Sequence, residues 1–201
     1  MSLIRIIGIS GSLRRGSHNT SLLQAAALSL PPGVQLEIYH DLANLPHYNE
    51  DLDIEPVPAP AARLRVEIAA ADGVLIATPE YNGSLPGVLK NAIDWASRPF
   101  PENALKGKPA AVIGASTGLF GAVWAQAETR KTLEVAGADV LDGEVPVGQA
   151  HAAFTDNGRL IEPEIRSALD ELVGVLAARA GATGGSPQRL DAPAVTVPRD
   201  A

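Results

Sequence analysis

The stretch GSLRRGSHNTS, residues 11–21, brings glycines, hydroxyls, an arginine and an asparagine together directly after an apolar run. A loop that leads from a strand into a helix can bind phosphate, because the first helical N–H groups lack partners and the helix dipole favours negative charge there. Arg14 could bind such a phosphate through two N–H groups, and the glycines would let the backbone curl around it. One arginine with neutral donors suits a single terminal phosphate monoester. The short donors in this loop are Ser12, Ser17 and Asn19.

This loop lacks two common phosphate-binding signatures, GxGxxG and GxxxxGK[ST]. A dinucleotide site would also need an acidic residue about 20 positions further on for the ribose, and Glu37 is a poor candidate for that role. Simpler interpretations stay open at this point. The serines and the asparagine could merely cap the next helix, and His18 could be either an exposed loop histidine or a further phosphate contact.

The loop TPEYNGSLPG, residues 78–87, is rich in proline and glycine. It should therefore be stiff and present backbone N–H and C=O groups edgewise. Such groups match the hydrogen-bonding edge of a flavin ring, and Tyr81 could pack or hydrogen-bond near that ring. Glu80 could act as a general base, although we favour a role in capping a helix or bracing the loop.

A third unusual loop, STGLFGA, covers residues 116–122. Ser116, Thr117 and Gly118 could lie under a flavin ring, because a glycine permits close approach of the backbone. The alternative is an ordinary helix entry that a serine or threonine caps. The loop by itself does not decide between the two.

Strands and helices alternate around these loops. Continuous apolar runs or period-two alternation predict strands at 3–9, 34–39, 73–78 and 109–116, and a fifth strand that begins at 138–141. Amphipathic periodicity with proline or glycine boundaries predicts helices at 20–30, 61–71, 87–97, 122–137 and 163–180, and a long polar loop at 40–58.

This alternation indicates an α/β protein with a mostly parallel sheet and helices on both faces. Five strands fit the flavodoxin-like, doubly wound order 2-1-3-4-5. In such folds ligands bind beyond the carboxyl ends of the strands, near the switch between the first and third strands. The loops after the first, third and fourth strands should therefore converge on one site.

Composition limits the classes of function. The 201 residues suggest one domain at 1–180, followed by a tail at 181–201 that mixes Gly, Pro and small residues and is interpreted as flexible. Because the chain has no cysteine, thiol chemistry is excluded and redox chemistry would need a bound cofactor. The net charge of −7, with scattered basic residues, argues against nucleic-acid binding. We find no signal peptide or membrane-spanning run, which fits a cytoplasmic protein.

Two motifs resemble a known family. GSLRRGSHN matches the phosphate motif GSxRxxSxN of the NADPH-dependent FMN reductase family, and PEYNGSLPGVLKNAIDW, residues 79–95, resembles that family's flavin-ring loop and following helix. The resemblance extends from about residue 4 to residue 178 and is strongest with the branch that contains bacterial chromate and quinone reductases and azoreductases. The tail has no counterpart in this resemblance.

The resemblance implies a non-covalently bound FMN that takes a hydride from NADPH or NADH. Electrons would pass by a ping-pong mechanism to a quinone, a metal oxyanion, an azo compound or free flavin. No side chain needs to act as nucleophile or base, so no catalytic residue is predicted. The same resemblance assigns three sets of residues. Those that bind the FMN phosphate are Ser12, Arg14, Ser17, His18 and Asn19, those that border the ring edge are Pro79, Glu80, Tyr81 and Asn82, and Ser116 lies on the opposite side. The loop itself adds Thr117 and Gly118 to Ser116 as candidates.

Two other classes stay open, a one-electron flavin carrier and a flavin-binding, redox-sensing interaction protein. Carriers usually have a phosphate loop without arginine and are strongly acidic, so Arg14 and the charge of −7 argue against that class. The resemblance also implies a homodimer or homotetramer. The helices that carry Trp95 and Trp124 are candidate contact surfaces, and Arg130 could pair with Glu144 across the contact or within one surface.

Overall fold

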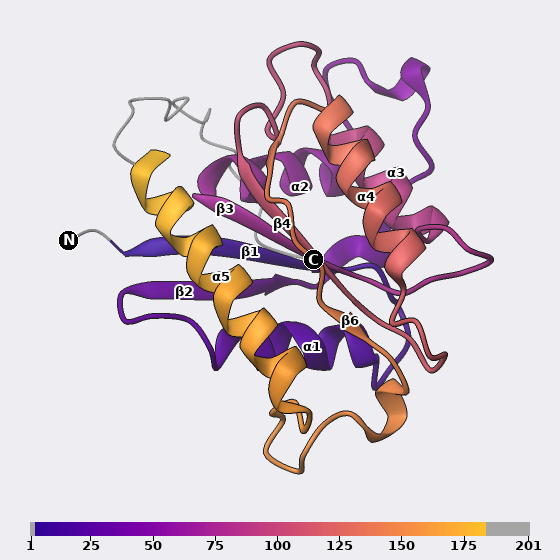
Figure 1. Cartoon of the computed structure of the whole chain (residues 1–201). Helices are drawn as coiled ribbons and strands as arrows, with labels where there is room; N and C mark the ends of the chain where they lie inside the picture. Colours follow the sequence, from indigo (N-terminus) through magenta and orange to yellow (C-terminus); the bar gives the residue numbers. More distant parts are fainter. Residues whose placement is uncertain (1–2, 184–201) are drawn as a thin grey trace, which may run out of the picture.

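The structure, a computed structural model, describes residues 3–183 of the chain. Its centre is a parallel sheet with the strand order β2-β1-β3-β4-β5, as the sequence predicts, and β6 pairs with β4 further along that strand (Figure 1). The strands are β1 (Ile4–Ser10), β2 (Val34–Tyr39), β3 (Gly73–Thr78), β4 (Pro109–Ala115), β5 (Asp139–Val140) and β6 (Pro146–Val147).

Helices cover both faces of this sheet (Figure 1). They are α1 (His18–Ala27), α2 (Ala59–Ala70), α3 (Gly87–Ala96), α4 (Val123–Val135) and α5 (Pro163–Thr183). One face packs against α1 and α5 through residues such as Leu22 and Leu176. The other face packs against α2, α3 and α4 through residues such as Leu64, Leu89 and Leu133. The fold is therefore the doubly wound, three-layer arrangement that the sequence predicts.

The two central strands, β3 and β4, are buried along their whole length. Neighbouring side chains of β3 enter opposite layers, Leu75 beneath α1 and α5 and Ile76 beneath the other helices. Because both faces are covered, these strands are continuous apolar runs. The parallel pairing brings the carboxyl ends of β1, β3 and β4 to one edge of the sheet, where the three unusual loops begin.

The fifth strand, which the sequence predicts to begin at 138–141, is not continuous. Two short strands replace it, because β5 pairs with the start of β4 and β6 with its end. Between them the chain leaves the ladder, and the buried side-chain oxygen of Gln126 on α4 accepts a hydrogen bond from the N–H of Val145 (3.3 Å). Gly143 and Pro146 favour this interruption, since glycine weakens a strand and proline cannot donate to a ladder.

Several helix boundaries also shift by one to three residues. The helix predicted at 20–30 begins earlier, at His18, where Ser17 caps it. The last helix continues to Thr183 instead of ending at 180, so the predicted boundary between domain and tail falls inside α5. The rest of the predicted tail, residues 184–201, lies outside the described part of the chain.

The long loop predicted at 40–58 contains two short 3₁₀ turns, η1 (Asp41–Asn44) and η2 (Glu50–Leu52). Trp95 on α3 holds this loop, because its indole N–H donates to the carbonyl oxygen of Pro46 (2.8 Å). Trp95 is fully buried, as expected of a core residue. The loop is therefore anchored to the helix that follows the predicted flavin-ring loop.

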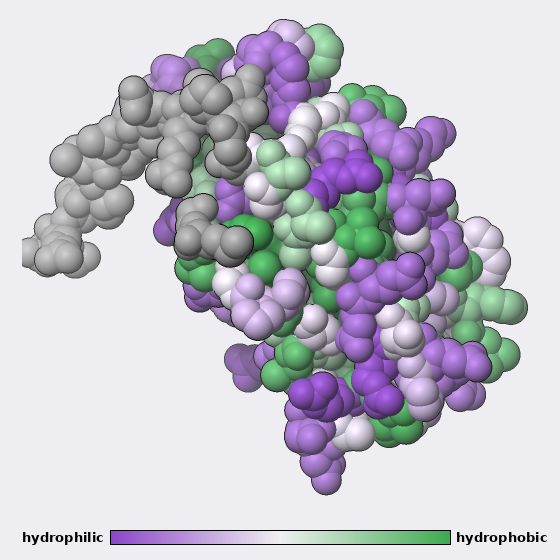
Figure 2. Space-filling view, turned by 60° about the vertical axis from the view of Figure 1, so that its left-hand side comes forward, coloured by the Kyte–Doolittle hydropathy of each residue, from purple (hydrophilic) through white to green (hydrophobic). Residues whose placement is uncertain are grey.

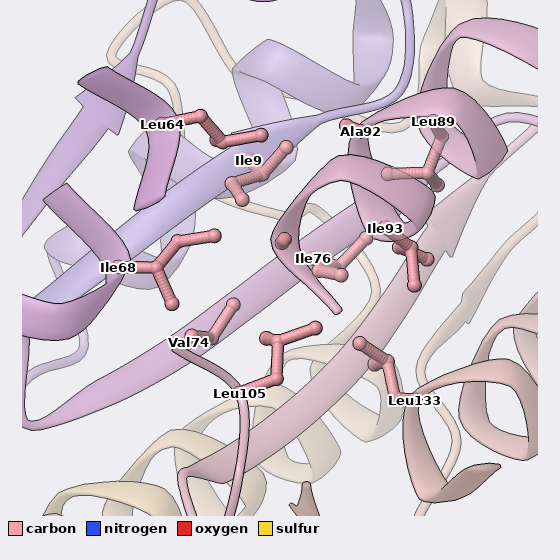
Figure 3. A pocket seen from close by; sticks show the side chains of 11 residues that line it. Ile9, Leu64, Ile68, Val74, Ile76, Leu89, Ala92, Ile93, Leu105 and Leu133 are labelled. Atoms are coloured by element: carbon pink, nitrogen blue, oxygen red, sulfur yellow. The ribbon is translucent and has the colours of Figure 1, made fainter. Parts of the chain in front are cut away.

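A small gap interrupts the core between the sheet and the helices α2 and α3 (Figure 3). All 11 side chains that line it are aliphatic, among them Ile9, Leu64 and Ile76. Its volume of about 10 Å³ is at most the room that one water needs, and an apolar lining of this kind stays dry. We therefore assign it to imperfect core packing and look for the functional site at the carboxyl edge of the sheet.

The opposite edge, where the strands begin, faces the viewer in Figure 2. Hydrophobic residues on this face are interspersed with hydrophilic ones, which is ordinary for a protein surface. Among residues 3–183, no helix is both long enough and apolar enough to cross a membrane.

Candidate functional site

The loop after β1 is tied into the first turn of α1. Ser17 is the N-cap of α1, and its hydroxyl accepts a hydrogen bond from the N–H of Thr20 (3.3 Å). The hydroxyl of Ser10 accepts from the N–H of Ser12 (3.4 Å) and from the hydroxyl of Thr20 (3.1 Å). The helix cap considered from the sequence is therefore present, and the first helical N–H groups remain at the open start of the helix.

The charge around this helix start is positive. α1 carries no acidic residue in its first turn, and Arg14 is exposed and forms no ion pair within residues 3–183. Burial lowers the pKa of His18, and the charges of Arg14 and of His151 lower it further. Arg14 and His151 therefore both lie within electrostatic reach of His18, which suits the binding of an anion.

The loop after β3 contains a tight turn at Tyr81–Ser84. The backbones of these two residues exchange hydrogen bonds of 3.0 and 3.2 Å. Asn82 and Gly83 between them have φ angles of 55° and 76°, the combination of a type I′ turn, which an Asn-Gly pair favours. The turn leaves the side chain of Tyr81 52% exposed.

Two carboxylates brace this loop against α4. Glu80 accepts a hydrogen bond from the N–H of Ala125 (3.1 Å) in the first turn of α4. Glu128 accepts a hydrogen bond from the hydroxyl of Ser84 (2.6 Å). Pro79 is buried where the loop leaves β3. The contact of Glu80 agrees with a capping and bracing role rather than with a general base.

The loop after β4 is joined to the segment that follows β6. The carbonyl oxygen of Gly118 accepts a hydrogen bond from the N–H of Gln149 (2.9 Å). The hydroxyl of Ser116 accepts one from the N–H of Gly118 (3.1 Å), while Thr117 and Gly118 are exposed. The interpretation that Ser116 or Thr117 caps the next helix is wrong, because the N-cap of α4 is Ala122.

The segment after β6 is a component of this edge that the sequence analysis missed. Gln149 has a φ angle of 46°, and the other non-glycine residues with positive φ in the described chain, Asn82 and Ala122, lie in the loops after β3 and β4. Backbone strain of this kind concentrates at functional sites. The prediction gave only the start of the fifth strand and did not consider the loop beyond it, although Pro146 and Gly148 are residues that often mark a loop.

Comparison with known proteins identifies this arrangement of loops. Residues 4–152 match the family model described as NADPH-dependent FMN reductase. The chain belongs to this family. The resemblance that the two motifs carry is thereby confirmed, and the protein is an oxidoreductase that uses FMN and NAD(P)H.

Relatives of this family member cover nearly its whole length. An NAD(P)H-dependent FMN reductase from Pseudomonas aeruginosa is 47% identical over 174 residues, which are 86% of this chain and 93% of the relative. A 2-hydroxy-1,4-benzoquinone reductase from Burkholderia sp is 37% identical over 176 residues, 87% of this chain and 95% of the relative. The solved structure of FerB, a flavoenzyme NAD(P)H:(acceptor) oxidoreductase from Paracoccus denitrificans, gives a TM-score of 0.79 at 36% identity, covering 89% of this chain and 98% of FerB.

The carboxyl edge of this family member fits FMN in its chemistry. The capped start of α1 and the guanidinium of Arg14 suit a phosphate dianion. The rigid turn at Tyr81–Ser84 suits a planar ring that is recognised along its edge. The carboxylates of Glu80 and Glu128 are held by α4 and by the turn itself.

An exposed apolar patch borders the same edge, and we call it the aromatic patch. It consists of Leu119, Phe120 and Trp124, which are 73%, 63% and 54% exposed, and the rings of Phe120 and Trp124 lie 5.3 Å apart. Trp95 cannot contribute to a contact surface, because it is buried. Arg130 and Glu144 pair within the chain (2.6 Å), which is the second of the two interpretations considered for them.

The lowered pKa of His18 predicts a pH dependence of stability in the FMN-free protein. The unfolded chain titrates His18 near pH 6.5, whereas the folded chain resists protonation to a lower pH. The unfolded state therefore binds more protons below about pH 6.5, and stability falls as the pH drops through this range. We expect His18→Gln to lose less stability than the wild type between about pH 7.5 and 5.5 in urea unfolding. Identical losses in the two proteins would contradict the prediction.

Proposed function

We propose that this family member is an NAD(P)H:quinone oxidoreductase that binds one FMN and follows a ping-pong mechanism. The observation that carries the proposal is the meeting of two features at one sheet edge. One is a capped helix start with an exposed Arg14, and the other is a rigid turn with an exposed Tyr81. Quinones are the favoured acceptors because the Burkholderia relative is named a benzoquinone reductase. Metal oxyanions, azo compounds and free flavin are the other acceptors to be tested.

The proposed FMN site has three parts. The helix start and the loop before it hold the phosphate, the turn after β3 borders the ring edge, and the loop after β4 lies on the opposite side. The phosphate residues are Ser12, Arg14, Ser17, His18 and Asn19, the ring-edge residues are Pro79, Glu80, Tyr81 and Asn82, and the residues opposite are Ser116, Thr117 and Gly118.

The chain contributes binding and orientation, and FMN, when bound, accepts electrons from the nicotinamide nucleotide and gives them to the acceptor. Arg14 and the start of α1 neutralise the phosphate charge. The turn at Tyr81–Ser84, which two backbone hydrogen bonds close, would border the ring edge. Glu80 is engaged with the N–H of Ala125 (3.1 Å), so we do not assign it as a base. Because the flavin would carry the chemistry, no other side chain is needed as nucleophile or base. Donor and acceptor would use the same open side of the site in turn.

Two competing functions are a one-electron flavin carrier and a flavin-binding, redox-sensing interaction protein. A carrier would need a separate reductase, and a sensor would turn over slowly or not at all. The exposed guanidinium of Arg14 and the family membership favour the enzyme. Steady-state consumption of NADPH with a quinone separates the enzyme from the other two.

The test begins with the purified protein and its visible spectrum. Mass spectrometry of the released cofactor should give FMN, and FAD would overturn the single-phosphate assignment. NADPH and NADH oxidation is then followed with benzoquinone, chromate and an azo dye, and parallel double-reciprocal lines would support the ping-pong mechanism. Absence of turnover with every acceptor, in protein that contains FMN, would favour the carrier or the sensor.

We further propose that the protein is a homodimer or homotetramer in which a second copy covers the aromatic patch. Two-fold dimers are the commonest soluble oligomers, and a cluster of large apolar side chains at 54–73% exposure favours a partner. Light scattering should give twice or four times the chain mass of 20.8 kDa. Trp124→Glu should shift the mass toward 20.8 kDa. A wild-type monomer at working concentration would refute the assembly.

A further inference from the structure

Asn19, at the start of α1, is only 3% exposed. Its side-chain amide makes two hydrogen bonds to one residue, Ala115 at the end of β4. The Nδ2 group donates to the carbonyl oxygen of Ala115, and the N–H of Ala115 donates to Oδ1, both at 2.9 Å. The two residues are 96 positions apart in the chain. A carboxamide held in this way takes the place of the backbone of a neighbouring strand.

The pairing of β4 explains why the backbone N–H and C=O of Ala115 are available to a side chain. Gly114 and Ser116 donate their backbone N–H groups toward the β6 side of the strand. Because successive residues of a strand direct their backbone groups to opposite sides, Ala115 faces the side of β3. The register between β3 and β4 ends at the pair of Thr78 and Gly114. Asn19 therefore binds Ala115 just beyond the point where β3 stops.

We propose that Asn19 is a positioning residue that holds the start of α1 and the loop after β4 in a fixed relation. Ala115 directly precedes Ser116, so this contact connects the phosphate part of the proposed FMN site to the part opposite the ring. The inference rests on the proposed site. It also refines the role of Asn19. The side chain of Asn19 binds Ala115, so the group of Asn19 that is left for phosphate is its own backbone N–H, in the first turn of α1.

Few side chains of this size can satisfy both backbone groups of Ala115. An aspartate would accept from the N–H but would place an anionic oxygen against the carbonyl oxygen. An alanine would leave both groups unpaired in a buried place, which is costly. Asn19→Asp keeps the shape of the side chain, whereas Asn19→Ala removes the amide. Both variants are made so that the test can still be carried out if one of them fails to fold.

The first experiment uses the FMN-free protein, so it does not depend on the proposed function. Hydrogen exchange at the amide of Ala115 should become at least about tenfold faster in Asn19→Ala, which removes the acceptor of that amide, and in Asn19→Asp, where repulsion between the carboxylate and the carbonyl oxygen of Ala115 opens the contact. Arg14→Ala and Gln24→Ala, at exposed positions before and within α1, should leave this rate unchanged. Unchanged exchange in both Asn19 variants would overturn the proposal.

The second experiment compares FMN with riboflavin, which has the same ring but no phosphate. Both affinities should fall about 3- to 30-fold in Asn19→Ala at a temperature where the variant is folded. Arg14→Ala should weaken FMN and leave riboflavin unchanged. A loss confined to FMN would make Asn19 a phosphate ligand, and unchanged affinities with lower stability would make it merely structural, so either result refutes the proposal. If the wild type binds neither flavin, the proposed function fails and the exchange result still decides the contact.

Discussion

Arg14→Ala is expected to weaken FMN binding about 10- to 150-fold, which corresponds to the loss of a charge-assisted hydrogen bond of about 1.5–3 kcal/mol. Arg14 is exposed beside the capped start of α1, and it forms no ion pair within residues 3–183. Its removal therefore costs the fold little. Titration of the FMN-free variant with FMN, followed by flavin fluorescence, measures the change.

Arg15→Ala is the matched control for this measurement. Arg15 is the next residue, carries the same charge and is also exposed, but the family motif assigns it no contact. A general electrostatic attraction would be reduced in both variants and would disappear at high salt. Equal effects of the two substitutions would therefore mean that Arg14 is not a specific part of the phosphate site. If neither substitution weakened FMN binding, the whole loop would be excluded from that site.

Gly121→Ala is expected to destabilise the protein by about 2–5 kcal/mol, the sum of a left-handed backbone cost and of overpacking. Gly121 has a φ angle of 58°, and a Cβ atom there would overlap the backbone of Pro146 and Val147. The loop after β4 and strand β6 could then no longer approach each other. Urea unfolding should show the loss of stability, and the FMN content of the purified variant should fall with it.

Gly107→Ala separates the two causes. Gly107 has a similar φ angle of 64°, but a Cβ atom there would meet nothing within 4 Å. We therefore expect only the backbone cost, about 1–2 kcal/mol, and an unchanged FMN content. If both variants lose the same stability, close approach at Gly121 contributes nothing and the loop after β4 is less constrained than its contacts indicate.

Local patterns predicted the parts of this fold that depend on local physics. The apolar runs of β3 and β4 are buried on both faces, and such runs are identifiable from the sequence alone. Asn82 and Gly83 form a turn whose positive φ angles those two residue types tolerate best. Pro86 directly precedes α3, at a position where its missing N–H costs nothing.

Contacts between distant segments were not predictable in the same way. The split of the fifth strand depends on Gln126, a polar side chain whose partner N–H lies on Val145. The two hydrogen bonds of Asn19 reach 96 positions along the chain, and the motif by itself suggested a ligand contact instead. Polar residues have several possible partners, and only the packed structure decides between them. The site was thus predicted by its loops, while the contacts that hold the loops together were not.

The interruption between β5 and β6 has a consequence for assembly. An uninterrupted strand at the edge of a sheet offers a row of N–H and C=O groups on which a strand of another molecule can grow, and this is a common start of aggregation. Here that edge consists of two strands of two residues each, with a proline at the start of the second. Two copies of this chain therefore cannot join their sheets across this edge into one continuous sheet. An assembly on this side has to form through side-chain contacts.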